Sequence, residues 1–190
     1  MKQIVLASTS PYRKQQLETL GISFACHAPL IDEEKEKNPN LKAKDLALHL
    51  SHLKAKSLAR NNQITIGGDQ LVYFQGDILG KPGTKDKAKQ QLLKMQGKTH
   101  ELITALCIFD GLEPHSLLNV TEIKIKSLSE QQIEKYIDLD SPTDCAGSYK
   151  IEKHGIQIIE EIKTSDFTAI QGLPLLSLSK KLTELGIKIP

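Results

Sequence analysis

The sequence contains no tryptophan and few aromatic residues of any kind, since Tyr and Phe together make up 4% of its 190 residues. Basic and acidic residues nearly cancel, so the formal net charge is only +2. Proteins that bind nucleic acid combine a strongly basic surface with exposed aromatic side chains. The composition therefore disfavours a nucleic-acid-binding module, and any basic site must be a local cluster.

Long apolar runs and paired cysteines are also missing from the sequence. No run approaches the roughly 20 residues that a membrane-spanning helix needs. The apolar stretch at residues 4–7 is too short for the apolar region of a signal peptide. The scattered cysteines, Cys26, Cys107 and Cys145, form no CxxC pair and cannot all be joined in disulfides. We expect a cytoplasmic protein with no membrane partner.

The remaining composition is that of a globular protein, with 39% hydrophobic and 25% charged residues. The length suits one domain, which we expect to span residues 1–190. Periodicity and turn signals predict strands at residues 2–7, 64–74, 78–79, 99–109, 117–126 and 156–162. They predict helices at residues 10–21, 41–60, 84–95, 129–139 and 174–185. This alternation predicts an α/β fold with a mixed sheet, in one domain that can form two lobes.

The first candidate site follows the first predicted strand. Ser10 is a suitable N-cap and Pro11 suits the first helical position. The next turn should favour acidic residues, yet Arg13 and Lys14 stand there. Free N–H groups at a helix start, the hydroxyls of Ser8 and Ser10, and an arginine fork together make an anion site. The plainer alternative is a surface helix that carries two solvated cations.

The second candidate lies inside an apolar strand, where Gly67 and Gly68 precede Asp69 and Gln70. A carboxylate between apolar neighbours costs several kcal/mol unless cations or a metal compensate its charge. The two glycines allow a second backbone or a ligand to approach closely. The alternative is that Asp69 faces water at a bulge or strand end.

Two lysines complete the candidate cations. Lys54 lies at the edge of the apolar stripe of its predicted helix, where a lysine can also simply extend its ammonium to water. Lys81 stands between Gly80 and Pro82 on a stiff segment that can place a point charge well. An irregular stretch at residues 144–152 has the mixed polar groups of a ligand-binding loop. The acidic run at residues 32–34, expected in a loop, can supply oxygen ligands to a hard cation.

Taken in order, these segments resemble the Maf family of nucleotide pyrophosphatases over almost the whole chain. The matching segments are LASTSPYRKQQLETLG (6–21), PLIDE (29–33), KAKSLA (54–59), GGDQLV (67–72), ILGKP (78–82), TEIKI (121–125), IEKYI (133–137), CAGSYKIE (145–152) and QGLPLLSL (171–178). Each segment is short, but their joint order is specific. The resemblance implies a mixed, twisted sheet flanked by helices, with two lobes around a central cleft as in Maf and ITPase-like proteins. It also implies a homodimer, since members are often dimeric.

The resemblance implies hydrolysis of a nucleoside triphosphate to a monophosphate and pyrophosphate, with Mg²⁺ or Mn²⁺ as cofactor. The family pattern falls on Ser8, Arg13, Glu33, Lys54, Asp69 and Lys81, and Asp69 matches the acid–base group. Chemistry agrees, because cleavage between the α- and β-phosphates needs an activated water and positive charge near the leaving pyrophosphate. Asp69 and Glu33 would hold the metal. The phosphates would contact the helix start at Ser10 and, as cations, Arg13, Lys54 and Lys81.

Three positions depart from the commonest family pattern: Tyr12 stands for Arg, Gln70 for Thr and Glu152 for Gln. These departures resemble the branch that acts on 7-methyl-GTP rather than the branch that acts on dTTP and UTP. N7-methylated guanine is cationic, so the ring of Tyr12 can stack on it with a gain of about 0.5–2 kcal/mol. The carboxylate of Glu152 can accept hydrogen bonds from N1–H and N2–H₂ of guanine, whereas thymine and uracil offer one donor.

The sequence thus predicts a pyrophosphatase that removes a modified nucleotide, 7-methyl-GTP. One alternative keeps the chemistry and changes the substrate to dTTP or UTP, against which Gln70 and Glu152 argue. Another alternative is a nucleotide-binding regulator of cell division without turnover. A pure binder would not need the acid–base carboxylate of Asp69, and this disfavours the regulator.

Overall fold

The computed structural model describes residues 2–189. The strands are β1 (Gln3–Ala7), β2 (Ala25–His27), β3 (Gln63–Phe74), β4 (Asp77–Leu79), β5 (Thr99–Asp110), β6 (Glu113–Ile125) and β7 (Ile159–Lys163). The α-helices are α1 (Pro11–Glu18), α2 (Glu33–Glu36), α3 (Ala43–Lys56), α4 (Lys85–Met95), α5 (Glu130–Asp140) and α6 (Leu175–Glu184). Short 3₁₀ helices are η1 (Ala146–Ser148), η2 (Gly155–Ile158) and η3 (Phe167–Gln171).

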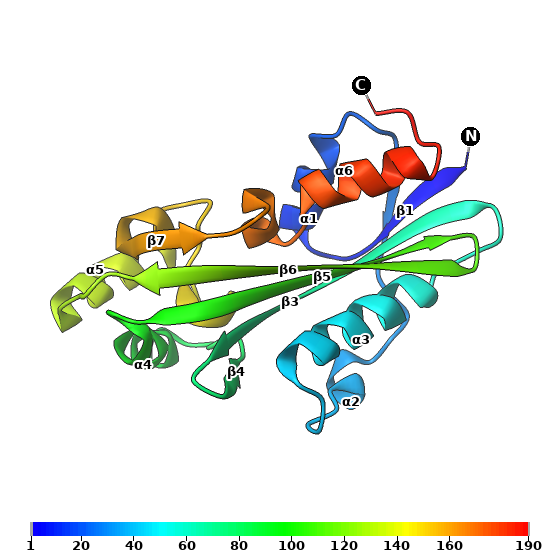
Figure 1. Ribbon diagram of the computed structural model, residues 1–190. Coiled ribbons are helices and arrows are strands. Elements are labelled where there is room, and N and C mark those ends of the chain that lie inside the picture. The colour runs from blue at the N-terminus through cyan, green and yellow to red at the C-terminus, as the bar shows by residue number, and fades with distance from the viewer. Residues whose placement is uncertain (1, 190) are drawn as a thin grey trace. The chain divides into compact units, whose positions relative to one another are not determined.

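The strands form one mixed sheet in the order β2-β1-β3-β5-β6-β7, and β4 pairs with β3 (Figure 1). β1 runs parallel to both β2 and β3, whereas β4 is antiparallel to β3 and β7 is antiparallel to β6. Helices lie between most of the strands in the chain, as the alternating pattern predicts. The predicted α/β class, a mixed sheet flanked by helices, is confirmed.

Several local predictions need correction. Residues 156–158 belong to η2 rather than to the last strand, which begins at Ile159. The predicted helix at 41–60 is shorter and ends at Lys56. The acidic run at residues 32–34 does not lie in a loop, because Glu33 and Glu34 begin the short helix α2. The N-terminal end of a helix carries partial positive charge, so acidic side chains in the first turn stabilise the helix. This explains why the acidic run can be helical.

Two compact units divide the chain. Unit 1 comprises residues 1–70, 103–119 and 166–190, and unit 2 comprises residues 71–102 and 120–165. Three strands, β3, β5 and β6, contribute residues to both units. The cleft implied by the family resemblance stays a prediction.

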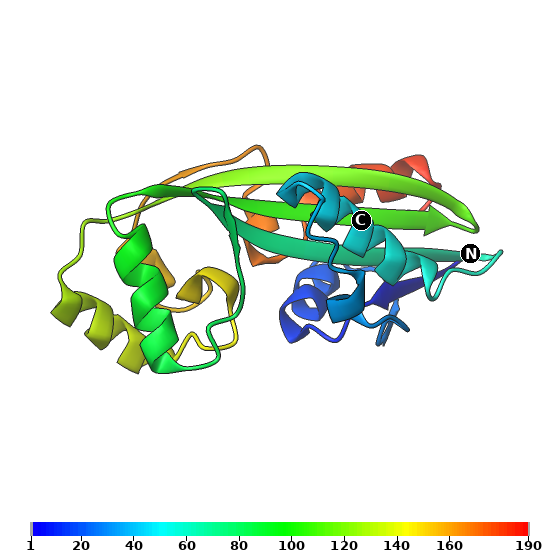
Figure 2. The ribbon, with the colours of Figure 1, turned by 90° about the horizontal axis from the view of Figure 1, so that it is seen from below.

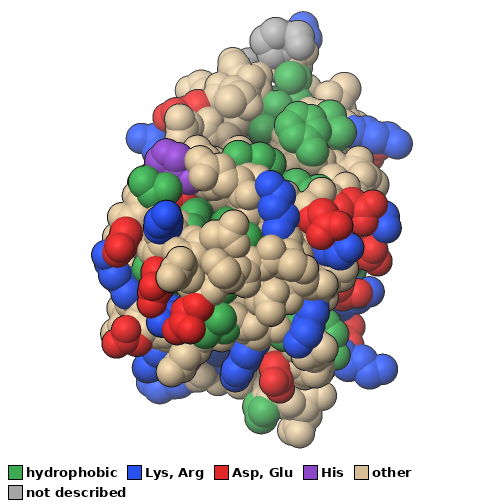
Figure 3. Space-filling view, turned by 90° about the vertical axis from the view of Figure 1, so that its left-hand side faces the viewer, with side chains coloured by type: hydrophobic (Ala, Val, Ile, Leu, Met, Phe, Trp, Pro, Cys, Tyr) green, Lys and Arg blue, Asp and Glu red, His purple; other side chains and the backbone are tan. Residues whose placement is uncertain are grey.

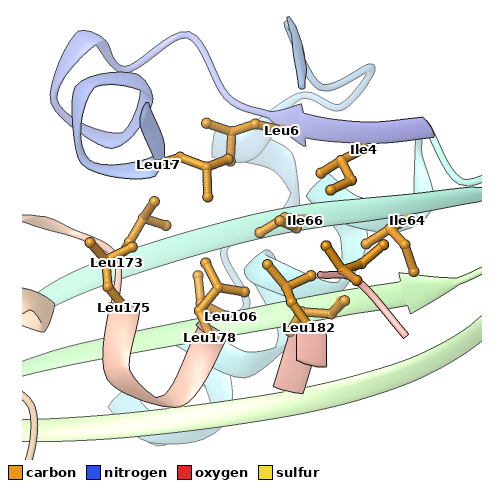
Figure 4. Close-up of a cluster of buried hydrophobic side chains, with 12 residues drawn as sticks. Ile4, Leu6, Leu17, Ile64, Ile66, Leu106, Leu173, Leu175, Leu178 and Leu182 are labelled. Carbon is orange, nitrogen blue, oxygen red and sulfur yellow. The ribbon is translucent and has the colours of Figure 1, made fainter. Parts of the chain in front are cut away.

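In unit 1, α3 lies on one face of the strands and α6 on the other (Figures 1 and 2). The core on the α6 side is a cluster of aliphatic side chains (Figure 4). Its buried members are Ile4, Leu6, Leu17, Ile64, Ile66, Leu106, Ile108, Leu173, Leu175, Leu178, Leu182 and Ile187. Ile64 and Ile66 alternate with Thr65 and Gly67, so successive β3 residues point to opposite faces. This alternation determines which side of the strand each site residue occupies.

Unit 2 is built around α4 and α5, which pack against each other. The Ser148 hydroxyl donates to Oε1 of Gln91 over 2.6 Å and ties η1 to α4. The Tyr136 hydroxyl accepts from the backbone N–H of Lys150 over 2.9 Å. These bonds hold the irregular 144–152 stretch in place. Acidic and basic side chains are interspersed on the face seen in Figure 3.

The helices within residues 2–189 are each too short or too polar to cross a membrane. The cysteines in that part of the chain carry free thiols, with Cys107 buried and Cys26 and Cys145 half-buried.

Candidate active site

The centre of the candidate site is a buried lysine shared by two carboxylates. Nζ of Lys54, on α3, lies 2.8 Å from Oδ1 of Asp69 on β3 and 2.9 Å from Oε2 of Glu33 on α2. The side chains of Lys54 and Asp69 are 6% and 7% exposed, whereas that of Glu33 is 46% exposed. Lys54 therefore does not extend to water. The structure brings together three residues that the sequence analysis singled out separately.

Gly67 is the reason that α3 can approach β3 so closely. A Cβ atom at this position would lie 2.4 Å from the backbone nitrogen of Ala55 and 2.5 Å from the carbonyl oxygen of Ser51. Both atoms belong to the backbone of α3 and cannot move aside as a flexible side chain would. Asp69 points to the same face as Gly67, because side chains two residues apart on a strand share a face. The predicted close approach of a second backbone is confirmed.

The carboxylate of Asp69 uses only one of its oxygens. Oδ1 accepts a hydrogen bond from Lys54, while Oδ2 is buried and has no hydrogen-bond partner in residues 2–189. The ammonium compensates the cost of burying the carboxylate charge. Oδ2 keeps its lone pairs available for a proton or a cation. A buried acceptor left without a partner in this way is costly and needs an explanation, which a reactive role would provide.

Arg13, in α1, lies beside Gly68 on β3. A Cβ at Gly68 would come within 3.4 Å of Nε of Arg13, and a Cβ at Gly172 within 3.2 Å. Nε donates a hydrogen bond to the carbonyl oxygen of Gly172 over 3.2 Å. Burial lowers the pKa of the guanidinium, and the negative charges of Asp69 and Glu33 oppose this shift. The guanidinium remains a cation at neutral pH, and it attracts both carboxylates electrostatically.

The two serines before α1 both accept hydrogen bonds from the backbone, and Ser10 is the N-cap of the helix. The Ser8 hydroxyl accepts from the N–H of Ser10 over 3.1 Å, and the Ser10 hydroxyl accepts from the N–H of Arg13 over 3.4 Å. Each hydroxyl keeps its own proton to donate to an anion. Lys14 instead lies on the surface, 3.9 Å from the carboxylate of Glu18. The solvated alternative is therefore correct for Lys14 but not for Arg13.

Gln70 points away from Asp69 and toward η3. Its amide nitrogen donates to the carbonyl oxygens of Ala169 and Ile170, over 2.8 and 3.3 Å, and to the Thr104 hydroxyl over 2.9 Å. These contacts occupy the donors of the side chain. The predicted role of Gln70 in base selection would therefore use its carbonyl oxygen or act through η3. Tyr12 is half-buried in the first turn of α1.

Lys81 and Glu152 belong to unit 2, and both side chains are exposed. The loop of Lys81 is anchored on both sides. The Gly80 carbonyl accepts from Gln91 over 2.9 Å, and the Gly83 N–H donates to the Thr143 carbonyl over 2.9 Å. Glu152 lies in a tight turn closed by a 2.9 Å bond from the N–H of Gly155 to the Lys150 carbonyl. Their predicted contacts with phosphate and base stay predictions.

The carboxylates of Asp69 and Glu33 fit a divalent metal that is shared with a substrate. Within residues 2–189, no three His, Cys, Asp or Glu side chains gather as a ligand set of their own. Mg²⁺ commonly binds through one or two carboxylates, with substrate phosphates and water supplying the other oxygens. The buried, unpartnered Oδ2 of Asp69 and the half-exposed carboxylate of Glu33 offer such a pair.

The sequence analysis missed two buried polar residues that hydrogen-bond to the 168–173 segment. Gln16, one turn beyond Arg13 on α1, is 5% exposed, and Thr104, in β5, is fully buried. The signal for Thr104 is a hydroxyl inside the apolar run at residues 102–109. Gln16 has only its helical spacing from Arg13, which places both side chains on one face of α1.

Sequence comparison identifies the family of the chain. A family model described as Maf-like protein matches residues 3–185. The chain belongs to the Maf family. This confirms the family resemblance drawn from the ordered motifs.

Individual relatives cover almost the whole chain or all of it. A protein of Bdellovibrio bacteriovorus named 7-methyl-GTP pyrophosphatase is 53% identical over 186 residues, which is 98% of each chain. A protein of the same name from Xanthomonas oryzae pv. oryzae is 37% identical over 192 residues and the full length of both. Among solved structures, a HAM1 protein from Coxiella burnetii matches 97% of this chain and 100% of its own at a TM-score of 0.49 and 17% identity.

Proposed function

We propose that the chain is a nucleoside triphosphate pyrophosphatase that converts 7-methyl-GTP and water to 7-methyl-GMP and pyrophosphate. The observation that carries the proposal is the buried carboxylate of Asp69, with Oδ1 on Lys54 and Oδ2 unpartnered. This arrangement provides an ionised base that is fixed in position and has one oxygen available. The relatives named 7-methyl-GTP pyrophosphatase, at 53% and 37% identity, support the reaction and the substrate.

In this reaction, water attacks the α-phosphorus and the bond between that phosphorus and the bridging oxygen to the β-phosphate breaks. Oδ2 of Asp69 accepts the proton that the water loses, and pyrophosphate leaves with the electron pair. Lys54 fixes Asp69 through Oδ1 and holds Glu33, so two of its three N–H groups are occupied. Its third N–H can donate to a phosphate oxygen. Correct placement of a base contributes typically about 10²–10⁴-fold to a rate.

Arg13 and the start of α1 would bind the phosphates. Nε of Arg13 is used by Gly172, which leaves the two terminal guanidinium nitrogens to make paired hydrogen bonds to phosphate. The hydroxyl protons of Ser8 and Ser10 add two neutral donors at the positive end of α1. Lys81, held on its anchored loop, would add a further cation. These groups together would offset the charge that develops on the leaving pyrophosphate.

A divalent metal, Mg²⁺ or Mn²⁺, would be held by Asp69 and Glu33. When bound, it would polarise the phosphoryl group and lower the pKa of a bound water. Lys54 lies between the two carboxylates, and its ammonium offsets part of their negative charge. We also propose that the reaction takes place in the cytoplasm, where nucleoside triphosphates are made and used.

For base selection, we propose that the ring of Tyr12 stacks on the cationic 7-methylguanine and that Glu152 accepts from its N1–H and N2–H₂ groups. Gln70 would assist through its carbonyl oxygen or through η3. A dTTP or UTP pyrophosphatase is the second candidate, because the same phosphate chemistry serves any base. The two candidates differ only in the contacts made by Tyr12, Gln70 and Glu152.

The deciding experiment measures pyrophosphate release from 7-methyl-GTP, GTP, dTTP, UTP and CTP with Mg²⁺ or Mn²⁺, using Asp69→Asn as the inactive control. Preference for 7-methyl-GTP supports both the reaction and the base contacts. Preference for pyrimidines keeps the reaction and rejects the base contacts. Tight nucleotide binding without turnover of any substrate rejects the enzyme and favours the regulatory alternative.

A further inference from the structure

Several buried or partly buried side chains hydrogen-bond to the backbone around Gly172. The amide nitrogen of Gln16 donates to the carbonyl oxygens of Thr168 and Leu173, over 2.8 and 3.4 Å, and its carbonyl oxygen accepts from the N–H of Leu173 over 3.0 Å. The side chain of Gln16, on α1, therefore hydrogen-bonds to both ends of the 168–173 segment. Gln16 is 5% exposed, so no water competes freely for these bonds.

Two residues of the sheet hydrogen-bond to the middle of the same segment. Gln70, on β3, donates to the carbonyls of Ala169 and Ile170. Thr104, on β5, donates to the Ala169 carbonyl over 3.1 Å and accepts from Gln70. The 168–173 segment thus has anchors on α1, β3 and β5, all within unit 1. Three elements of the core determine its position.

The segment in turn contacts Arg13. The Gly172 carbonyl accepts from Nε of Arg13, and Gly172 itself has φ of 115°, a conformation that a residue with a Cβ rarely adopts. A Cβ there would also lie 3.3 Å from Cγ of Arg13. The arginine stem therefore lies directly on the segment. A guanidinium whose Nε is fixed has its two terminal nitrogens aimed in one direction.

We propose that Gln16, Gln70 and Thr104 are positioning residues that aim the guanidinium of Arg13 through the 168–173 segment. The inference rests on the proposed function, in which Arg13 binds the phosphates of the substrate. Gln16 is the principal member, because it lies one turn from Arg13 on α1 and holds both ends of the segment. On this account, Gln70 acts on the phosphates through Arg13, independently of any contact with the base.

The chain allows a direct spectroscopic test, because Arg13 and Arg60 are its only arginines. Labelling with [¹⁵N]arginine gives two Nε–H signals, which Arg60→Lys assigns. We expect Gln16→Met to speed solvent exchange of the Arg13 Nε–H at least tenfold and to leave the Arg60 signal unchanged. The matched control is Gln15→Met, which changes the exposed neighbour on the same helix and should alter neither signal.

Binding supplies the second readout. We expect Gln16→Met to weaken the affinity for inorganic pyrophosphate about tenfold by calorimetry. In an Arg13→Ala background the same change should weaken it less than twofold, since Gln16 acts through Arg13. Full additivity in the two backgrounds, or an unchanged Arg13 signal in a folded Gln16→Met protein, overturns the proposal. If Gln16→Met does not fold, Thr104→Val, which removes one hydroxyl, is put through the same two measurements and judged by the same outcomes.

Neither readout requires turnover, so the two proposals can fail separately. Suppose that the protein hydrolyses no nucleotide, that Gln16→Met speeds exchange of the Arg13 Nε–H, and that the effects of Gln16→Met and Arg13→Ala on pyrophosphate affinity are non-additive. This result would reject the proposed function and support the positioning network. Nucleotide hydrolysis with additive binding effects would do the reverse. Among active variants, the network also predicts that Gln16→Met raises KM for the triphosphate more than it lowers kcat.

Discussion

Lys54 and Asp69 form a buried ion pair between α3 and β3, with Nζ and Oδ1 2.8 Å apart. The pair exists because Gly67, two residues before Asp69, lets the backbone of α3 come close to the strand. Glu33 shares the same ammonium from the solvent side. The distribution of charge is therefore asymmetric, with one carboxylate enclosed by protein and one open to ligands.

Replacing Lys54 by Met should lower the free energy of unfolding by about 3–5 kcal/mol, because it leaves the Asp69 carboxylate buried without a cation. Urea denaturation of the variant measures the effect. The double variant Lys54→Met, Asp69→Leu is the control, since it removes both charges and should recover most of the loss. A single variant as stable as the parent protein would contradict the ion pair described here.

Asparagine at position 69 should reduce pyrophosphate release about 10²–10⁴-fold, because an amide oxygen cannot take the proton of the attacking water. The side chain keeps its shape and its contact with Lys54, so circular dichroism and the melting curve should show an intact fold. Asp45→Asn, on the exposed side of α3, is the matched control and should retain full activity. Substantial turnover by Asp69→Asn would assign the base to another residue.

Much of this site could be predicted from the sequence, because its charged residues stand in stretches that are otherwise apolar. A carboxylate in the apolar strand at residues 64–74 requires a cation, and Lys54 at the edge of an apolar stripe is a suitable donor. The structure pairs them. The short elements β2 and α2 were not predicted, because three or four residues carry too little periodicity to distinguish strand, helix and loop. Residues 156–158 have the apolar pattern of a strand but form a 3₁₀ turn.

Long-range partners account for what the sequence could not predict. Nothing near Gln16 in the chain indicates that it binds residues 168 and 173, and nothing near Gln70 indicates that its amide faces η3. Such bonds depend on packing between segments that are far apart in the chain. Lys81 and Glu152 lie in unit 2, and their roles still rest on the family pattern.

The two glycines before Asp69 should respond differently to alanine. At Gly67 the new methyl group meets the backbone of α3 at 2.4 Å, so Gly67→Ala should destabilise the protein by about 1–3 kcal/mol or more. At Gly68 it meets side chains, Leu106 at 3.0 Å and Arg13 at 3.4 Å, which can shift. Gly68→Ala should therefore fold with little loss but bind pyrophosphate more weakly. Equal melting temperatures for the two variants would show that the approach of α3 does not depend on Gly67.

Exchanging Glu152 for Gln tests base selection. A hydrogen bond to a charged group contributes about 1.5–3 kcal/mol, so the preference for 7-methyl-GTP over UTP, measured as a ratio of kcat/KM values, should fall at least tenfold. Hydrolysis itself should continue, because the phosphate contacts are unchanged. Glu113→Gln, at an exposed position of β6, controls for the loss of one negative charge. If both variants rank the nucleotides as the parent does, Glu152 does not read the base.

Acid should destabilise the protein through His100, which is buried on β5 with Nε2 2.9 Å from the Tyr149 hydroxyl. Burial lowers the pKa of this imidazole to about 4. In the unfolded chain the imidazole of His100 is protonated below about pH 6.5, whereas in the folded protein it stays neutral down to about pH 4. The free energy of unfolding therefore falls as the pH drops from about 6.5 to about 4, and below that this contribution is constant. The loss should approach about 3 kcal/mol in urea denaturation. His100→Gln should remove this part of the pH dependence, whereas His27→Gln, at an exposed site, should keep it. Identical pH profiles for the two variants would place the acid sensitivity elsewhere.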